Sequence, residues 1–295
     1  MSRAGLFSGT VTESAPADNA PTTKHKGHHW FQWGVTQDPV DNCTAKYIEA
    51  LGPTSQSYSK DNLWPASGNM FTFAGFYRVP DWHLNGGTFI KSTYFDVAFR
   101  YWYTGERRCA FDIDLYTPGY AGNYRLETKI LYPELTIGEW FCLMYSIDTS
   151  PAGAPTRSSW LHKVGSNTPV NLFVGASRDD YATGPGTPFD FNDSSSKWTL
   201  GSNLIDPNRG QNYEQGNMII TDEYVDWDDQ NNRDLMVNPL NGKPVGLGVD
   251  GSLLTGNAAK IYLAKGDGTD NGGTAGNFTV INGPIADAPT SPCDG

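Results

Sequence analysis

The stretch Gly138-Glu139-Trp140-Phe141-Cys142-Leu143-Met144-Tyr145-Ser146-Ile147-Asp148 decides the fold of this chain. Successive side chains of a β-strand point to opposite faces, and in this stretch both faces are apolar. One face carries three apolar residues and the other carries four: Trp140, Cys142 and Met144 against Phe141, Leu143, Tyr145 and Ile147. A strand with two apolar faces is stable only when both are covered. We therefore predict a central strand of a β-sandwich.

Short strand-like segments separated by turn residues recur on both sides of this stretch. The chain has 15 Tyr, 14 Phe and 9 Trp, which favour strands, and 33 Gly and 19 Pro, which favour turns. No long segment has the apolar period of a helix. Besides the central strand, strands are predicted at residues 45–51, 70–79, 88–92, 94–103, 108–116, 124–131, 170–177, 197–201 and 217–227. Loops fill the rest of 35–68, and an insertion at 149–169 and a polar loop at 178–196 are predicted to lack strands. The pattern predicts an all-β fold, a jelly-roll sandwich.

Composition divides the chain into three parts. Residues 1–29 are dominated by Ser, Thr, Ala, Pro and Asp and predict a flexible or partner-bound arm. Residues 30–228 hold the predicted sandwich. Residues 229–295 are rich in Gly, Asn and Asp and have too few apolar residues for a second core, so we expect an extension that packs on the sandwich or on a neighbouring chain. One short helical segment and two strand-like segments are predicted in it, at 229–237, 260–264 and 277–281.

The chain is acidic, with a net charge of −11 at pH 7. An acidic surface argues against binding to a nucleic-acid backbone and against docking on anionic lipid. The N-terminal residues lack the apolar core of a secretory signal, and no apolar run has the length needed to insert into a membrane. We expect synthesis in the cytoplasm without membrane insertion.

The four cysteines lack the close spacing of a zinc site. Cys109 and Cys142 lie in predicted strands among apolar residues and are interpreted as reduced core residues. A disulfide between Cys43 and Cys293 would join the two ends of the folded part, and the sequence alone leaves that pairing open.

The order of several motifs resembles a known superfamily. They are Phe71-Thr72-Phe73-Ala74-Gly75-Phe76-Tyr77-Arg78, Gly87-Thr88-Phe89-Ile90, Gly138-Glu139-Trp140, Val170-Asn171-Leu172-Phe173-Val174-Gly175, Trp198-Thr199-Leu200-Gly201 and Thr221-Asp222-Glu223-Tyr224-Val225-Asp226-Trp227. This order resembles the laminin-G / concanavalin-A-like lectin-glucanase superfamily over roughly residues 65–228. The resemblance implies a concanavalin-like sandwich.

The extension carries a second resemblance. Residues 242–252 and 274–280 look like the tail appended to this sandwich in some bacteriophage and prophage structural proteins. This resemblance implies a virion component, in capsid decoration or in a tail or fibre. It also implies a homo-oligomer whose partners are other virion proteins, with a host-surface polysaccharide as a further partner.

Catalysis is the alternative function. In the family's glucanases, the catalytic carboxylates stand in a Glu-x-Asp-x-x-Glu motif along one strand. The nearest stretch here holds only Asp112 and Asp114, and Thr117 stands where the second Glu would be. In the last predicted strand Asp222 and Asp226 share a face, whereas Glu223 points the other way. We therefore expect no enzyme activity, with a polysaccharide hydrolase or lyase, or a free lectin-like module, as alternatives.

A lyase would need a base and an acid such as His and Tyr. His83 and His162 are the histidines to consider, and both are predicted to lie in surface loops.

A mixed aromatic and charged surface is the candidate binding site. Two predicted strands joined by a hairpin turn at 104–106 carry its residues on their outward face. These residues are Tyr94, Asp96, Arg100, Trp102, Asp112, Asp114 and Tyr116. Aromatic rings and directional polar groups of this kind bind sugars, and the same residue types are enriched at protein interfaces. The face is therefore predicted to bind a glycan or a partner.

No cofactor is predicted, with calcium as the open alternative. Calcium prefers oxygen ligands, and several turns are rich in Asp and Asn. They are Asp179-Asp180, Asp190 to Asp193, Asp226 to Asp229 and Asp267 to Asn271. None has the spacing of an EF-hand loop, and such residues are also common in turns that bind no metal.

Overall fold

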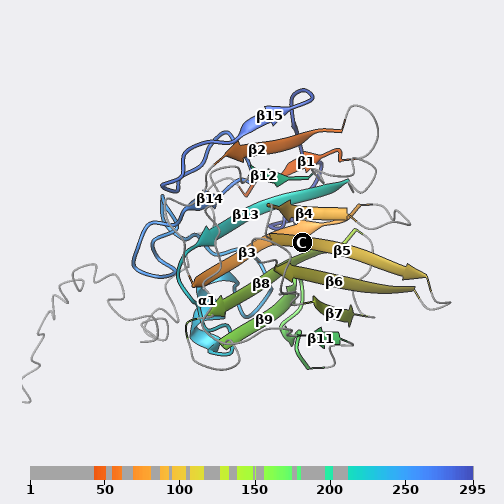
Figure 1. Cartoon of the computed structure of the whole chain (residues 1–295), viewed down its shortest axis with the longest axis vertical. Helices are drawn as coiled ribbons and strands as arrows, with labels where there is room; N and C mark the ends of the chain where they lie inside the picture. Colours follow the sequence, from red (N-terminus) through yellow and green to blue (C-terminus); the bar gives the residue numbers. More distant parts are fainter. Residues whose placement is uncertain are drawn as a thin grey trace, which may run out of the picture.

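The computed structural model describes residues 43–50, 55–61, 69–80, 87–92, 95–103, 107–115, 127–132, 138–148, 150, 156–174, 178–180, 197–201 and 212–294. The predicted arm, residues 1–29, lies outside the described residues. The described residues form two antiparallel sheets packed face to face and one short helix (Figure 1).

The first sheet has the strand order β10-β9-β8-β3-β13-β1-β16, and β14 also pairs with β13. Its strands are β1 (Lys46–Ile48), β3 (Met70–Arg78), β8 (Trp140–Asp148), β9 (Thr156–Lys163), β10 (Val170–Asn171), β13 (Tyr213–Thr221), β14 (Ile261–Leu263) and β16 (Ala286–Asp287).

The second sheet has the order β11-β7-β6-β5-β4-β12-β2-β15. Its strands are β2 (Ser57–Asp61), β4 (Gly87–Lys91), β5 (Phe95–Tyr103), β6 (Arg107–Leu115), β7 (Glu127–Tyr132), β11 (Arg178–Asp180), β12 (Lys197–Leu200) and β15 (Thr279–Ile281). The chain passes repeatedly from one sheet to the other, so the predicted all-β, concanavalin-like jelly-roll sandwich is confirmed.

Strand β8 occupies the position that its two apolar faces predict. It pairs with β3 over nine residues and with β9 over eight, so neither edge is open. One face, with Phe141, Leu143, Tyr145 and Ile147, lies in the core between the sheets. The opposite face, with Trp140, Cys142 and Met144, lies in a second apolar cluster on the outer side of the first sheet.

The core between the sheets is built on stacked aromatic rings. Tyr77 of the first sheet stacks on Phe89 of the second, with ring centroids 4.4 Å apart. Tyr213 meets Phe89 edge to face at 5.1 Å, and its hydroxyl donates to the Phe89 carbonyl oxygen at 2.9 Å. Such pairs contribute stability beyond the area they bury, and these connect the two sheets directly.

The C-terminal segment supplies the cover of the outer face. Trp227, Met236, Leu247 and Tyr262, which come from residues after β13, pack against the outer side of the first sheet. Figure 1 shows the light-blue part of this segment on the side of the first sheet away from β5 and β6, whereas the dark-blue β15 lies beside β2 of the second sheet. The predicted extension is therefore packed on the sandwich itself.

A row of hydroxyl groups holds the start of this cover. The Thr72 hydroxyl donates to the Glu223 carbonyl oxygen at 2.6 Å and accepts from the Val225 amide at 3.1 Å. The Ser158 hydroxyl accepts from the Trp227 amide at 2.8 Å. Because these bonds come from side chains of the sheet, the backbone after β13 can leave the sheet and cross its outer face without losing its hydrogen bonds.

Glycines allow the segment to approach the sheet backbone closely. At Gly266, which has a φ of +71°, a Cβ atom would lie 2.1 Å from the Gln215 carbonyl oxygen. At Gly273 it would lie 2.5 Å from the Lys260 carbonyl oxygen. Contacts this short exclude any side chain, so the glycine content of the segment reflects backbone packed on backbone.

The structure corrects several predicted boundaries. Three segments predicted as loops contain strands, namely β2, β9 and β11. In β9 the reason is that Ser158 and Ser159 are buried with bonded hydroxyls, Ser159 donating to the Met144 carbonyl oxygen at 3.0 Å. The strand predicted at 170–177 stops after Asn171, whose side-chain oxygen accepts from the Phe173 amide at 2.9 Å and begins a turn.

The last predicted strand is displaced along the chain. It was expected at 217–227, whereas β13 begins at Tyr213 and ends at Thr221. The predicted helix is confirmed as α1 (Gln230–Met236), with Asp229 as its N-cap. Strands β14 and β15 fall within the two segments predicted in the extension.

Cys142 is a buried free thiol, as predicted. Cys43 and Cys293, which the sequence left open, form a disulfide. The Cys109 side chain lies outside the described part of the structure.

Candidate functional site

The predicted binding face rests on a hairpin that the structure contains. Strands β5 and β6 pair over nine residues, with Asp96 opposite Asp114 and Ala98 opposite Asp112. Val97 lies in the core, so these neighbouring positions belong to the outer face of the second sheet.

The other predicted site residues are placed only in part. Arg100 and Trp102 occupy alternate positions further along β5, on the same face as Asp96. Tyr94 and Tyr116 lie outside the described residues, as do the side chains of Arg100, Trp102, Asp112 and Asp114.

The same face continues across the sheet as a row of polar residues, here called the polar row. Each member is paired in register with the next across six strands. From β6 to β15 they are Asp114, Asp96, Lys91, Thr199, Ser59 and Thr279. At about 4.8 Å between strands, the row extends for about 24 Å.

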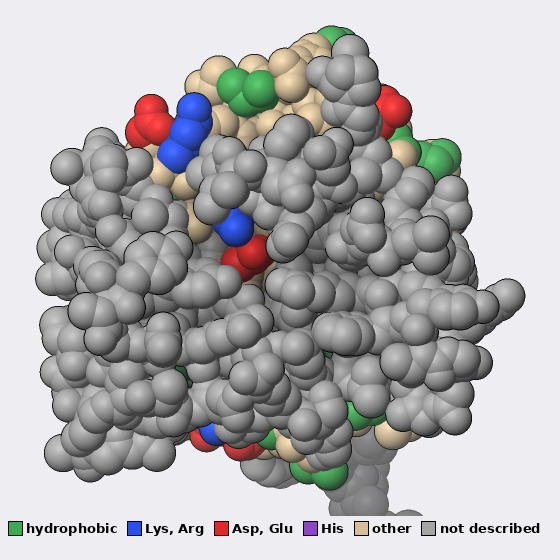
Figure 2. Space-filling model, turned by 45° about the vertical axis from the view of Figure 1, so that its right-hand side comes forward, with side chains coloured by type: hydrophobic (Ala, Val, Ile, Leu, Met, Phe, Trp, Pro, Cys, Tyr) green, Lys and Arg blue, Asp and Glu red, His purple; other side chains and the backbone are tan. Residues whose placement is uncertain are grey.

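An ion pair lies near the middle of the polar row. The Lys91 ammonium is 3.2 Å from a carboxylate oxygen of Asp96, and the two side chains are only 12% and 8% exposed. Thr199 and Ser59 are buried as well. Figure 2 shows a basic and an acidic side chain next to each other near the centre of this view. The exposed fractions show that the middle of the row is largely out of contact with solvent.

The chemistry of the polar row suits a neutral, hydroxyl-rich ligand. It offers an ammonium donor, carboxylate acceptors and hydroxyl groups that both donate and accept. The charges of Lys91 and Asp96 offset each other, so the row does not present a strong field of one sign.

Sequence reasoning missed four members of the row: Lys91, Thr199, Ser59 and Thr279. They come from segments far apart in the chain, and only the register between β4, β12, β2 and β15 brings them together. Alternation within each strand could have placed each on an outward face, but it does not indicate which strands are neighbours.

The outer face of the first sheet is occupied by the chain itself. The carboxylates predicted at the end of the last strand lie within that cover, and they have partners. Asp222 pairs with Lys260 at 3.0 Å, and Glu223 accepts from Asn257 at 2.6 Å. Asp226 accepts from the Asp228 amide at 3.0 Å.

His162 does not lie in a loop, which corrects the sequence prediction. It belongs to β9 and is 3% exposed, and its ring Nε2 donates to the Ser166 carbonyl oxygen at 2.9 Å. Burial lowers its pKa, and the nearby Arg233 acts in the same direction. His162 is therefore a buried neutral group rather than a surface base. His83 lies outside the described residues.

The acidic turns considered for calcium have structural roles where they are described. Asp229 caps α1 by accepting from the Asn231 amide at 2.9 Å, and Asp267 accepts from the Thr269 amide at 2.9 Å and pairs with Lys46 at 3.0 Å. Across the described part of the chain, no three His, Cys, Asp or Glu side chains gather as metal ligands. The side chains of Asp179 and Asp180 and residues 190–193 lie outside it.

A second polar cluster surrounds α1. The Arg233 guanidinium lies 3.9 Å from the ring centroid of Trp160, whose indole N–H donates to Asp228 at 2.8 Å. Asp228 also accepts from Asn171 at 3.2 Å. These contacts tie the helix to β9 and β10, and each group already has a partner within the cluster.

Asp234 in α1 makes stability depend on pH. Burial raises its pKa from 3.8 to about 6, although the positive charge of Arg233 acts in the opposite direction. Because the folded state holds this proton more tightly than the unfolded state, the contribution of Asp234 to stability falls as the pH rises from about 4 to 6. We expect Asp234→Asn to stabilise the protein by about 1 kcal/mol at pH 7, a value reduced for the half-exposed position, and to have no effect near pH 4.

Urea unfolding at the two pH values measures this difference. Asp229→Ala is the matched control in the same helix, and we expect a loss of about 1 kcal/mol because the cap is removed. Equal effects of Asp234→Asn on the free energy of unfolding at both pH values would contradict the raised pKa of Asp234.

Comparison with solved structures finds similar sandwiches. A SAP-like pentraxin from Limulus polyphemus is 11% identical, with 85% of this chain and 97% of that chain covered and a TM-score of 0.49. Tailspike protein 2 from Escherichia coli O157:H7 bacteriophage CAB120 is 10% identical over 80% of this chain and 31% of that chain, with a TM-score of 0.37. An alginate lyase from Chlorella virus is 15% identical over 60% and 83%, with a TM-score of 0.29.

Similarity at this level concerns the sandwich fold and assigns no activity to this chain. No protein-family model and no curated protein matches the sequence. In the described part of the chain, no helix combines the length and the apolar character required to cross a membrane.

Proposed function

We propose that this protein is a non-catalytic, glycan-binding structural component of a phage particle. The polar row on the second sheet is the observation that carries glycan binding. The assignment to a particle follows from the resemblance of the C-terminal extension to tails of phage structural proteins, and it is tested separately below.

The geometry of the polar row favours an extended polar ligand. Its members are aligned across the strands, and because Asp96, Thr199 and Ser59 are at most 6% exposed, a chain of sugar units along the row would contact mainly its less buried members. The groups at the centre are recessed and fixed, Lys91 and Asp96 by their ion pair. Fixed groups lose little freedom when a ligand binds.

The charge of the protein favours a neutral glycan over a polyuronate. A net charge of −11 repels polyanions at long range, and Lys91 is offset by Asp96. Binding that rests on neutral hydrogen bonds depends little on salt. We therefore expect an affinity that is nearly constant between low salt and about 1 M salt.

The arrangement of carboxylates favours binding over turnover. Asp96 and Asp114 are opposite each other on neighbouring strands, and a retaining glycosidase needs two carboxyl groups about 5 Å apart. However, such an enzyme needs one of the pair free to donate a proton to the substrate, and Asp96 is already engaged in an ion pair with Lys91 at 3.2 Å. Hydrolysis is therefore the second candidate, and the same variants test it.

Binding to a panel of neutral and acidic polysaccharides, followed by calorimetry on the best ligand, tests the site. We expect Asp114→Asn and Asp112→Asn to weaken binding about ten- to hundredfold, since each removes a charged acceptor. Asp222→Asn is the matched control, because it makes the same change of charge just after β13, in the segment that covers the outer side of the first sheet. Unchanged binding in Asp112→Asn and Asp114→Asn would refute the site, and new reducing ends or unsaturated products would replace the proposal with catalysis.

Assembly is tested by light scattering on the purified protein with and without residues 1–29. We expect a defined homo-oligomer that dissociates on truncation, because an arm too polar to fold alone is ordered most readily on a neighbouring subunit. A compact monomer indifferent to truncation, together with absence of the protein from gradient-purified particles, would exclude the particle role and leave a free lectin-like module.

A further inference from the structure

The last residues of the chain run as a strap along one edge of the first sheet. This C-terminal strap comprises residues 286–294. It begins with β16, which pairs with β1 through two residues, and continues with a bond from the Ala288 amide to the Ala45 carbonyl oxygen at 2.8 Å. Lys46 of β1 pairs with Asp287 of the strap at 2.9 Å.

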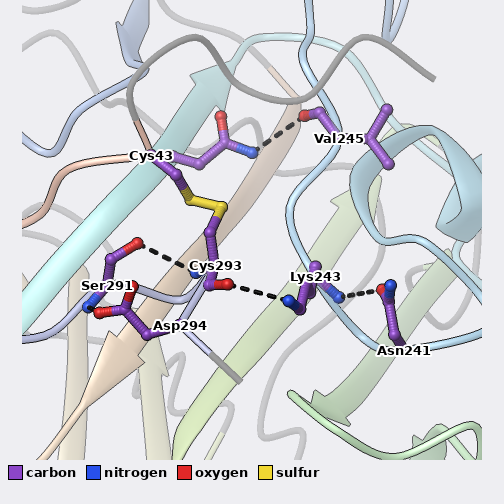
Figure 3. Close-up of a disulfide and its surroundings, with 8 residues drawn as sticks. Cys43, Asn241, Lys243, Val245, Ser291, Cys293 and Asp294 are labelled. Atoms are coloured by element: carbon purple, nitrogen blue, oxygen red, sulfur yellow. Dashed lines mark hydrogen bonds between the residues drawn. A yellow bond between two sulfur atoms is a disulfide. The ribbon is translucent and has the colours of Figure 1, made fainter. Parts of the chain in front are cut away.

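The Cys43–Cys293 disulfide closes the far end of the strap (Figure 3). The two Cα atoms are 5.8 Å apart, and Cys43 lies just before β1. The Lys243 ammonium donates to the Cys293 carbonyl oxygen at 2.9 Å, and the Cys293 amide donates to the Ser291 hydroxyl at 3.0 Å. The disulfide therefore fixes the C-terminus against the strand that the strap covers.

The strap has almost no apolar anchor of its own. Of residues 286–294, Pro292 alone is buried, and both residues of β16 are exposed. The Asp287 side chain is 81% exposed, so its pairing with Lys46 is largely screened by water. Terminal segments held in this way open readily unless they are tied down. The disulfide is the one covalent tie that the strap has.

Beneath the strap lie groups that are otherwise buried. The Thr290 hydroxyl accepts from the Trp140 indole N–H at 3.1 Å and donates to the Glu214 carboxylate at 2.6 Å. Glu214 is fully buried and Trp140 is 6% exposed. Opening the strap would expose both, together with the edge of β1.

We propose that the C-terminal strap is a thiol-controlled device, closed when Cys43 and Cys293 are oxidised and open when they are reduced. A dithiol reductant opens it in two steps. One thiolate attacks a sulfur of the disulfide and forms a mixed disulfide, and the second thiolate then displaces the remaining cysteine. The two electrons pass to the protein, which gains two thiols after protonation, and the reductant becomes a disulfide. The strap is thus open in a reducing cytoplasm and closed in an oxidising environment.

Hydrogen exchange measured by mass spectrometry on the full chain tests this proposal. We expect amides of residues 286–294 to exchange on the order of a hundredfold faster after reduction with dithiothreitol, or in Cys293→Ser without reductant. Peptides from residues 142–148 of β8, which pair with β3 and β9 and not with the strap, are the internal control and should keep their protection, because the core does not depend on the strap. Thr290→Val, which keeps the disulfide, should change exchange in the strap by only about fivefold.

Three results would overturn the proposal. The first is equal protection of residues 286–294 in oxidised and reduced protein, which would show that non-covalent contacts alone hold the strap. The second is alkylation of both Cys43 and Cys293 in protein purified without reductant, which would show that the disulfide does not form. The third is a loss of protection at residues 142–148 together with the strap, which would show that the disulfide stabilises the whole fold and does not control a local opening.

Discussion

Replacing Tyr77 by Phe is expected to stabilise the protein by about 1 kcal/mol, whereas replacing it by Ala is expected to cost about 3–5 kcal/mol. The ring stacks on Phe89 across the two sheets and is fully buried, so its removal would leave a cavity in the core. The hydroxyl has no hydrogen-bond partner among the residues that the structure describes. Burying a hydroxyl group without a hydrogen bond costs free energy, and Phe avoids this cost because it has no hydroxyl group.

Tyr213→Phe is the matched control for this prediction. Its hydroxyl lies in the same aromatic cluster but donates to the Phe89 carbonyl oxygen, so we expect a loss of about 1–3 kcal/mol. Urea unfolding with unchanged m-values would measure all three variants. A loss of stability in Tyr77→Phe similar to that in Tyr213→Phe would show that the Tyr77 hydroxyl has a bonding partner.

Removing the positive charge of Arg78 is expected to cost about 3–5 kcal/mol. Arg78 pairs with the carboxylate of Glu214 and donates through Nε to the Gly138 carbonyl oxygen at 2.7 Å. The Glu214 side chain is 1% exposed, so Arg78→Met leaves a buried carboxylate without its opposite charge and with the Thr290 hydroxyl as its remaining partner. Burial already raises the pKa of Glu214. In the variant it should rise further, so the loss should be larger at pH 8 than at pH 5, where the carboxyl group can take up a proton.

A surface pair in the same sheet provides the control. Lys163 and Glu139 are 3.2 Å apart with 29% and 35% of their side chains exposed, and we expect Lys163→Met to cost less than about 1 kcal/mol. The double variant Arg78→Met, Glu214→Met should recover much of the lost stability, since no charge remains buried. Equal losses of stability in Arg78→Met and Lys163→Met, measured by denaturant unfolding, would contradict the prediction that the buried Arg78–Glu214 pair matters more than the surface pair.

Local patterns in the sequence predict most of the fold because they reflect burial. The two apolar faces of the 138–148 stretch indicate a covered strand, and β8 is covered on both sides. The failures occur where polar residues are buried with partners. In β9 serine hydroxyls bond to neighbouring backbone, and in β13 Glu214 and Gln215 are fully buried, the first paired with Arg78 and the second bonded to the Gly266 carbonyl oxygen.

The candidate site could be predicted only within a single hairpin. Alternation in β5 and β6 places Asp96, Asp112 and Asp114 on one face, and the register agrees. Thr199, Ser59 and Thr279 were missed because their neighbours are set by strand pairing over long sequence distances. The polar character of a single strand gives no information on such pairing.

The cover on the outer side of β8 has a practical consequence for anyone who shortens this protein. A fragment ending near residue 228 would keep every strand of the sandwich up to β13, and it would look like a complete minimal module. It would lack the residues after 228 that pack against Cys142, Met144 and Ile219. A large apolar surface would then be exposed to solvent. Such a fragment should precipitate during expression, so the shortest soluble recombinant form has to retain the chain through at least Tyr262.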